Sequence, residues 1–151
     1  MEDEHRTRGH LTWSSVDRRL RSMREIWVAT ADAEARADAI PVWFWWDGEA
    51  VYFTTKASSR KARNIAAQPE IVIVNGDGAD PIIIRGRAER VDEKSELERL
   101  DAAYAEKYVA PESGERATIF VEGDVALRVQ PRQVVAWSYA NVGTRTDWCF
   151  D

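Results

Sequence analysis

The chain has a single cysteine, Cys149, among its 151 residues. One cysteine excludes an intrachain disulfide and a thiolate metal cluster, and no histidine lies beside it in the sequence to activate it as a nucleophile. The only two histidines, His5 and His10, lie in a charged N-terminal segment, where we interpret them as solvated. These absences predict no metal site and leave the catalytic residues unassigned.

Long apolar runs and an excess of positive charge are also lacking. No apolar run approaches the ~18 residues that cross a membrane, and the polar N-terminus has no signal-peptide pattern. The sequence therefore predicts a cytoplasmic protein that does not act at a membrane. The net charge of −5, with no obvious basic face, argues against non-specific nucleic-acid binding. It is compatible with a locally positive pocket for a small anion.

Tryptophan, by contrast, is abundant. There are seven in the chain, and three of them fall at Trp43, Trp45 and Trp46. Wide aromatic surfaces serve cores, dimer interfaces and flat ligands. The length fits one domain over residues 11–151 with a sizeable core, after a mobile charged tail at residues 1–10.

Turn signals and hydrophobic periodicity predict many short strands and few helices. Asp47-Gly48 is a strong hairpin signal. The expected N-caps are Ser14 or Ser15 for the first helix and Asp92 or Ser95 for the last. Helices are expected over residues 12–24, 58–67 and 92–108, and strands over 25–31, 39–46, 51–55, 71–74, 82–91, 118–121, 125–129, 134–137 and 148–150. This pattern is typical of a mainly β, closed or half-closed barrel with flanking helices.

The strand, turn and helix from Val51 to Lys61 form the strongest candidate for a binding site. Hydroxyl groups of Thr54 and Thr55, the free amides at the start of the helix, and the cations Arg60 and Lys61 would meet at one point. Such groups suit a phosphate. The other interpretation is a Ser-capped helix with an exposed basic turn, and the residues alone leave both open.

The preceding strand offers a second candidate element. Pro41 removes one backbone donor and leaves neighbouring backbone groups free to meet a ligand. A planar heteroaromatic ring could lie against the strand. The alternative is core and dimer packing, which we favour for at least two of its three tryptophans.

Together these segments resemble a known family. Pro41-Val-Trp-Phe-Trp-Trp-Asp-Gly-Glu-Ala-Val-Tyr-Phe-Thr-Thr, followed by Ser59-Arg-Lys-Ala-Arg-Asn64, resembles the pyridoxamine 5′-phosphate oxidase-like superfamily of FMN-binding split β-barrels. The resemblance is closest to its flavin/deazaflavin (F-420)-dependent oxidoreductase branch. Segments 27–30, 69–74 and 86–91 fall in matching order. The resemblance implies a split β-barrel that forms a homodimer with cofactor sites at the interface.

The resemblance also implies a cofactor, FMN or coenzyme F-420, and the residues that hold it. Its ring would lie along one strand and its phosphate at the following turn, with Lys56 adding a cation. The implied cofactor-binding residues are Pro41, Val42, Trp43, Phe44, Phe53, Thr54, Thr55, Lys56, Ser59, Arg60 and Lys61.

The expected function is an oxidoreductase that transfers hydride to or from a small organic substrate. Vitamin B6 synthesis is not expected. The vitamin-forming oxidases of the resembled superfamily hold their substrate with an arginine and a histidine close to the C-terminus, and the corresponding region here has Arg145 but no histidine. One alternative is a non-catalytic flavin, haem or tetrapyrrole carrier on the same scaffold. Another is a dimeric structural domain with an empty cleft.

Overall fold

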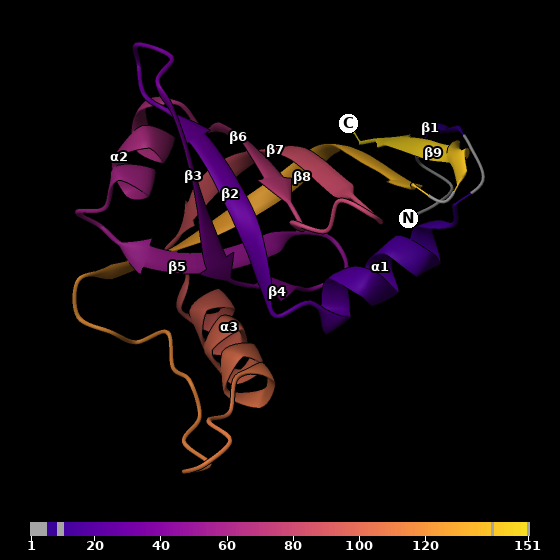
Figure 1. Ribbon diagram of the computed structural model, residues 1–151. Coiled ribbons are helices and arrows are strands. Elements are labelled where there is room, and N and C mark those ends of the chain that lie inside the picture. The colour runs from indigo at the N-terminus through magenta and orange to yellow at the C-terminus, as the bar shows by residue number, and fades with distance from the viewer. Residues whose placement is uncertain (1–5, 9–10, 140, 151) are drawn as a thin grey trace.

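The computed structural model describes residues 6–8, 11–139 and 141–150. These residues form one curled antiparallel sheet of nine strands, flanked by three helices (Figure 1). The elements are β1 (Arg6–Arg8), α1 (Trp13–Ser22), β2 (Glu25–Ala31), β3 (Ala37–Trp43), β4 (Trp45–Trp46), β5 (Val51–Lys56), α2 (Arg60–Ala67), β6 (Glu70–Val74), β7 (Ile82–Val91), α3 (Lys94–Lys107), β8 (Asp124–Ser138) and β9 (Asn141–Cys149). Residues 6–8 of the predicted tail pair with β9, and the rest of that tail lies outside the described residues.

The sheet curls into a half-barrel. Its strands follow the order β1-β9-β8-β7-β6-β2-β3, and β5 pairs with β4 and β8. The long β8 pairs with β5 through residues 124–129 and with β9 through residues 133–138, so it changes partner along its length. Within the described chain, β3 pairs only with β2, and the barrel is therefore split between β3 and β5. The expected mainly β, barrel-like fold with flanking helices is confirmed.

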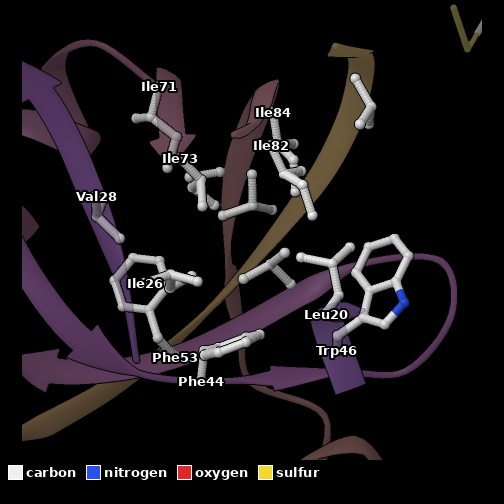
Figure 2. Close-up of a cluster of buried hydrophobic side chains, with 14 of the residues drawn as sticks. Leu20, Ile26, Val28, Phe44, Trp46, Phe53, Ile71, Ile73, Ile82 and Ile84 are labelled. Carbon is white, nitrogen blue, oxygen red and sulfur yellow. The ribbon is translucent and has the colours of Figure 1, made fainter. Parts of the chain in front are cut away.

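The main core fills the inside of this curl. Along β2, β6 and β7 buried and exposed side chains alternate, as strands with one inward face require. Figure 2 shows side chains from α1, β2, β4, β5, β6 and β7 pointing toward one another. The labelled residues are Leu20, Ile26, Val28, Phe44, Trp46, Phe53, Ile71, Ile73, Ile82 and Ile84.

A second, smaller core lies between the sheet and α3. Tyr52 of β5 packs there with Leu100 and Tyr104 of α3, whereas Val51 and Phe53 belong to the main core. β5 is therefore buried on both faces, which fixes the strand that leads to the predicted phosphate site.

None of the described helices is long and apolar enough to cross a lipid bilayer.

The helix caps differ from those expected at two of three positions. Thr12 caps α1, because its side chain accepts a hydrogen bond from the Ser15 amide, so the expectation of Ser14 or Ser15 was wrong. Glu93 occupies the N-cap of α3 without a side-chain hydrogen bond, so the expectation of Asp92 or Ser95 was wrong as well. The Ser95 hydroxyl donates to Glu93 instead.

Five strand predictions also require correction. The strand predicted over 148–150 is only the end of β9, which begins at Asn141 and ends at Cys149. The predicted strand over 39–46 is interrupted at Phe44 and begins earlier, at Ala37. Residues 118–121 form no strand, because Asp101 of α3 accepts hydrogen bonds from the Thr118 hydroxyl and the Ile119 amide. The two strands predicted over 125–129 and 134–137 are one, since β8 continues through Pro131 with a shift in register opposite β7.

Candidate functional site

The turn between β5 and α2 is held by hydroxyl and backbone contacts. The Ser59 Oγ caps α2 by accepting a hydrogen bond from the Ala62 amide at 3.1 Å. The Thr55 Oγ1 lies 3.0 Å from the same oxygen, and the Ser59 amide donates to the Lys56 carbonyl at 2.9 Å. These contacts fix the first turn of α2 against the end of β5.

A hollow of ≈ 510 Å³ is lined by residues of α2, from Arg60 onward, and by residues of the hairpin that joins β2 to β3. It is lined by Asp32, Arg36, Ala37, Asp38, Arg60, Arg63, Asn64 and Ala67. Arg36 forms ion pairs with Asp32 and with Glu34. Counting the neighbouring Lys61, four cations stand against three carboxylates, so the hollow is locally positive on a chain whose net charge is −5. The Asp32 carboxylate already accepts a 2.8 Å hydrogen bond from Arg36, which lowers the pKa of Asp32.

Lys61 is a buried cation next to this hollow, with only 9% of its surface exposed. Burial lowers the pKa of its ammonium group, and the charge of Asp38 acts in the opposite direction. One helical turn later, the buried Asn64 amide donates to the Thr30 hydroxyl of β2 at 3.0 Å. That bond fastens α2 to the sheet and thereby positions the cations of the helix.

The predicted phosphate residues occupy distinct environments. Arg60 lines the hollow, and Lys61 is buried beside it. The Phe53 side chain is fully buried in the main core, so only its backbone is available to a ligand. Lys56 is exposed and lies 3.8 Å from the Asp124 carboxylate. Thr54 is partly exposed at the end of β5.

Two further arginines of the hollow were not expected from the sequence. Arg63 follows Arg60 by three residues, a spacing that places both on one face of a helix and could have indicated it. Arg36 comes from the hairpin before β3, where the sequence indicated only a polar connection. Its place depends on a tertiary contact between the hairpin and α2.

The predicted ring-binding strand is the edge strand β3 and the residue that follows it. Pro41 is exposed and pairs with Trp27 of β2, and Val42 packs against the main core. Trp43 is 50% exposed and stacks on Tyr108, with ring centroids 4.3 Å apart and planes 2° from parallel. Phe44 is fully buried.

Three side chains at the end of α3 hold the break between β3 and β4, and we call them the α3 clamp: Tyr104, Lys107 and Tyr108. The Tyr104 hydroxyl donates to the Trp43 carbonyl at 2.9 Å, and Lys107 Nζ donates to the Phe44 carbonyl at 3.0 Å. The Tyr108 hydroxyl accepts from the Phe44 amide at 2.9 Å and lies 2.6 Å from the Arg24 carbonyl, to which it donates. Side chains thus satisfy backbone groups that a neighbouring strand would otherwise satisfy.

Burial changes the titration of all three clamp residues. It raises the pKa of Tyr104 well above its ordinary value. It raises the pKa of Tyr108 to about 12, so this hydroxyl keeps its proton at neutral pH. Burial and then the charge of Arg24 lower the pKa of Lys107 to about 8. In the described residues, no group of three His, Cys, Asp or Glu side chains could hold a metal ion.

The whole arrangement, from α1 to the end of β8, matches a known family model. The model of the pyridoxamine 5′-phosphate oxidase family matches residues 15–138. The chain belongs to this family. No curated protein matches it.

Solved structures with the family fold include proteins of different functions. A conserved hypothetical protein from Mycobacterium tuberculosis is 22% identical over 86% of each chain, with a TM-score of 0.72. HutZ, the haem storage protein from Vibrio cholerae, is 20% identical over 80% of this chain and 91% of that chain, with a TM-score of 0.63. PhzG from Burkholderia lata, solved in complex with tetrahydrophenazine-1-carboxylic acid, is 20% identical over 83% of this chain and 74% of that chain, with a TM-score of 0.58. At these identities the likeness concerns the fold.

Proposed function

We propose that this protein is an oxidoreductase that binds a flavin-type cofactor, FMN or coenzyme F-420, and transfers hydride to or from a small organic substrate. Membership of the pyridoxamine 5′-phosphate oxidase family supports redox chemistry. The cofactor, when bound, supplies the hydride chemistry, and the protein binds, orients and shields it.

The observation that carries this proposal is the positive hollow that runs along α2 from its first residue, Arg60, to its last, Ala67. Arg60, Arg63 and Arg36 converge on it, and Lys61 is buried next to it. Planar guanidinium groups and a helix N-terminus both suit a phosphate group. A bound phosphate would also relieve the repulsion among these cations, which lie where the helix dipole disfavours positive charge.

The edge strand β3 suits the ring of such a cofactor. Its free edge faces the split between β3 and β5, and the α3 clamp fixes its end. A flat ring could therefore contact backbone groups that do not shift on binding, which reduces the cost of ordering the site.

We further propose that the protein is a homodimer that joins through the outer face of the sheet. Four apolar residues form one row across β7, β6, β2 and β3: Ile83, Val74, Trp27 and Pro41. Trp27 is 41% exposed. A flat apolar face of this kind is typical of subunit interfaces.

A second candidate function is a carrier that binds haem or another tetrapyrrole without catalysis. The similarity in fold to the haem storage protein HutZ favours it. This candidate needs a ligand for the haem iron and does not need phosphate cations.

Titration of the purified protein with FMN and with coenzyme F-420 tests the proposed function. Tight binding is expected for at least one of them, observed as quenching of Trp fluorescence. The double variant Arg60→Ala/Lys61→Ala should bind more than about tenfold more weakly, because each charge-assisted phosphate contact contributes roughly 1.5–3 kcal/mol.

The matched control is Arg18→Ala/Lys94→Ala, which removes two exposed cations away from the hollow. It should bind like the parent. Equal affinity of the Arg60/Lys61 variant and the parent would refute the phosphate site. Stoichiometric haem binding at the Soret band, unchanged in that variant and without FMN or F-420 binding, would establish the carrier instead.

A further inference from the structure

We propose that a groove beside the end of β3 binds a planar aromatic anion, such as a fused-ring carboxylate. If the proposed oxidoreductase function holds, this groove assigns the class of its substrate. The groove has a volume of ≈ 370 Å³, which is within the range of small-molecule sites.

The wall of the groove is a rigid aromatic platform. Trp43 is half exposed even though Tyr108 covers one face of its indole at 4.3 Å. The Trp43 carbonyl is held by Tyr104, and the Tyr108 hydroxyl is fixed by backbone groups of Phe44 and Arg24. A flat ligand that stacks on this indole therefore meets a surface that is already ordered, and ring stacking contributes beyond simple burial.

The rest of the lining is apolar, with cations at its edges. Val109, Pro111 and Ala117 contribute apolar surface, and Arg24 and Arg116 contribute guanidinium groups. A ligand of this site thus needs both an apolar ring and a negative charge.

The two arginines have capacity left for an anion. Arg24 lies over the Tyr108 ring, with Cζ 5.3 Å from the centroid. Arg116 Nη1 donates to the Ala105 carbonyl at 3.0 Å, which holds its head group in place. Within the described part of the chain neither arginine forms an ion pair with a carboxylate.

The charges that line the groove itself sum to a positive excess. Arg24 and Arg116 line it, with Glu115 as the one carboxylate in that lining. Charges just behind the lining balance more closely: Glu25 is paired with Trp43 across β2 and β3, Asp101 accepts a hydrogen bond from Thr118, and Lys107 lies 5.3 Å from the Tyr108 ring centroid. Two lining arginines against one lining carboxylate favour a ligand with a single negative charge.

The groove also adjoins the strand that we propose for the cofactor ring. Trp43 is the last residue of β3 and lines the groove with its side chain. A ligand stacked there would lie at the end of the ring-binding strand. That place is close to the proposed cofactor ring, with which a substrate would exchange hydride.

Calorimetric titration with 2-naphthoate, without any flavin present, tests the groove. The parent should bind this probe. Trp43→Ala and Arg116→Gln should each weaken binding at least about fivefold, since each removes a stacking or a charge-assisted contact. The uncharged analogue 2-naphthalenemethanol should bind less tightly than 2-naphthoate by a similar factor.

Two control variants outside the groove are Tyr139→Ala and Arg18→Gln, which change an exposed aromatic residue and an exposed cation. Both should bind the probe like the parent. Absence of probe binding, or equal losses in groove and control variants, would overturn the proposal. If Trp43→Ala does not fold, Trp43→Phe retains a smaller ring and should give an intermediate affinity.

The groove and the proposed function fail independently in this design. Loss of naphthoate binding with intact FMN or F-420 binding refutes only the groove, and the opposite result refutes only the cofactor site. The substrate role requires, in addition, that naphthoate alter the fluorescence of bound FMN or F-420 in the parent but not in Trp43→Ala.

Discussion

At the residue scale, the ammonium group of Lys107 occupies an apolar setting. Its Nζ lies 3.7 Å from the centroid of the Phe44 ring and 3.0 Å from the Phe44 carbonyl oxygen. Burial and the nearby charge of Arg24 lower its pKa to about 8. The bond to the carbonyl does not require the charge, because a neutral amine also donates a hydrogen bond.

Lys107 is therefore expected to make the protein more stable as the pH rises above 8. An unfolded lysine has a pKa of roughly 10.4, so between the two values the unfolded chain binds more protons than the folded one, and the free energy of unfolding increases with pH. Lys107→Met should remove this increase. Urea denaturation of parent and variant at pH 7.5 and 9.5 measures it.

The control for this experiment is Lys94→Met, whose side chain is 91% exposed at the start of α3. It should leave the pH dependence unchanged. The prediction is wrong if Lys107→Met and the parent gain equal stability between the two pH values.

Single residues of the candidate site differ in how far the sequence predicts them. Arg60 and Lys61 follow from the strand-turn-helix pattern, and Arg63 follows from helical spacing. Arg36 does not, because it reaches the hollow through the packing of a hairpin on α2. The role of Tyr108 was also not predicted, because its hydroxyl binds backbone groups of Phe44 and Arg24 that are distant in the sequence.

At the element scale, β7 and β8 are joined through an irregular register. Arg85 pairs with Gln133 and Gly86 with Pro131, so Arg132 is an extra residue in β8. This bulge lies between the half of β8 that pairs with β5 and the half that pairs with β9. Bulges bend and twist a strand, which allows β8 to serve both partners.

The close approach at this bulge predicts a strong effect of Gly86→Ala. A Cβ at Gly86 would lie 2.4 Å from the Gln130 carbonyl oxygen, which is backbone and cannot rotate away. We expect a loss of roughly 1–3 kcal/mol in the free energy of unfolding, as for other overpacked sites. Urea denaturation measures it.

Gly78→Ala is the matched control, because a Cβ there would meet nothing within 4 Å. It should change stability by less than about 0.5 kcal/mol. Equal stability of the Gly86→Ala variant and the parent would show that the two strands separate at little cost.

Elements with strong local signals were predicted well, and those set by tertiary contacts were not. The strand over 25–31 matches β2, and the helix over 58–67 contains α2. The apolar run at 118–121 has strand-like composition. It forms no strand, because Asp101 of α3 accepts hydrogen bonds from its first two residues. Two strands were predicted over 125–129 and 134–137, because no local signal shows that β8 continues through Pro131 at a bulge.

At the scale of the whole molecule, the sheet separates two surfaces of unlike character. Its inner face encloses the main core, and its outer face over β6, β2 and β3 presents Val74, Trp27 and Pro41. The fold class followed from the order of strands and turns along the sequence. That the barrel is split came only from the resemblance, and the place of the split, between β3 and β5, was not predicted, since no local pattern tells which strands fail to pair.

The outer face predicts that Trp27→Glu dissociates the proposed homodimer. A carboxylate at the centre of an apolar interface is costly to desolvate. Sedimentation should show a dimer for the parent and a monomer for the variant. Tyr139→Glu, at a 64% exposed position elsewhere, is the control and should remain dimeric. A monomeric parent would refute the dimer.

The α3 clamp has a consequence for how this protein can evolve. In a regular sheet, many backbone hydrogen bonds hold each strand to its neighbours. A single substitution therefore hardly shifts the position of the strand. At Trp43 and Phe44 three side chains of a distant helix hold the backbone instead. Selection can therefore retune the geometry of β3 by exchanging residues on α3, while the strand itself keeps its sequence.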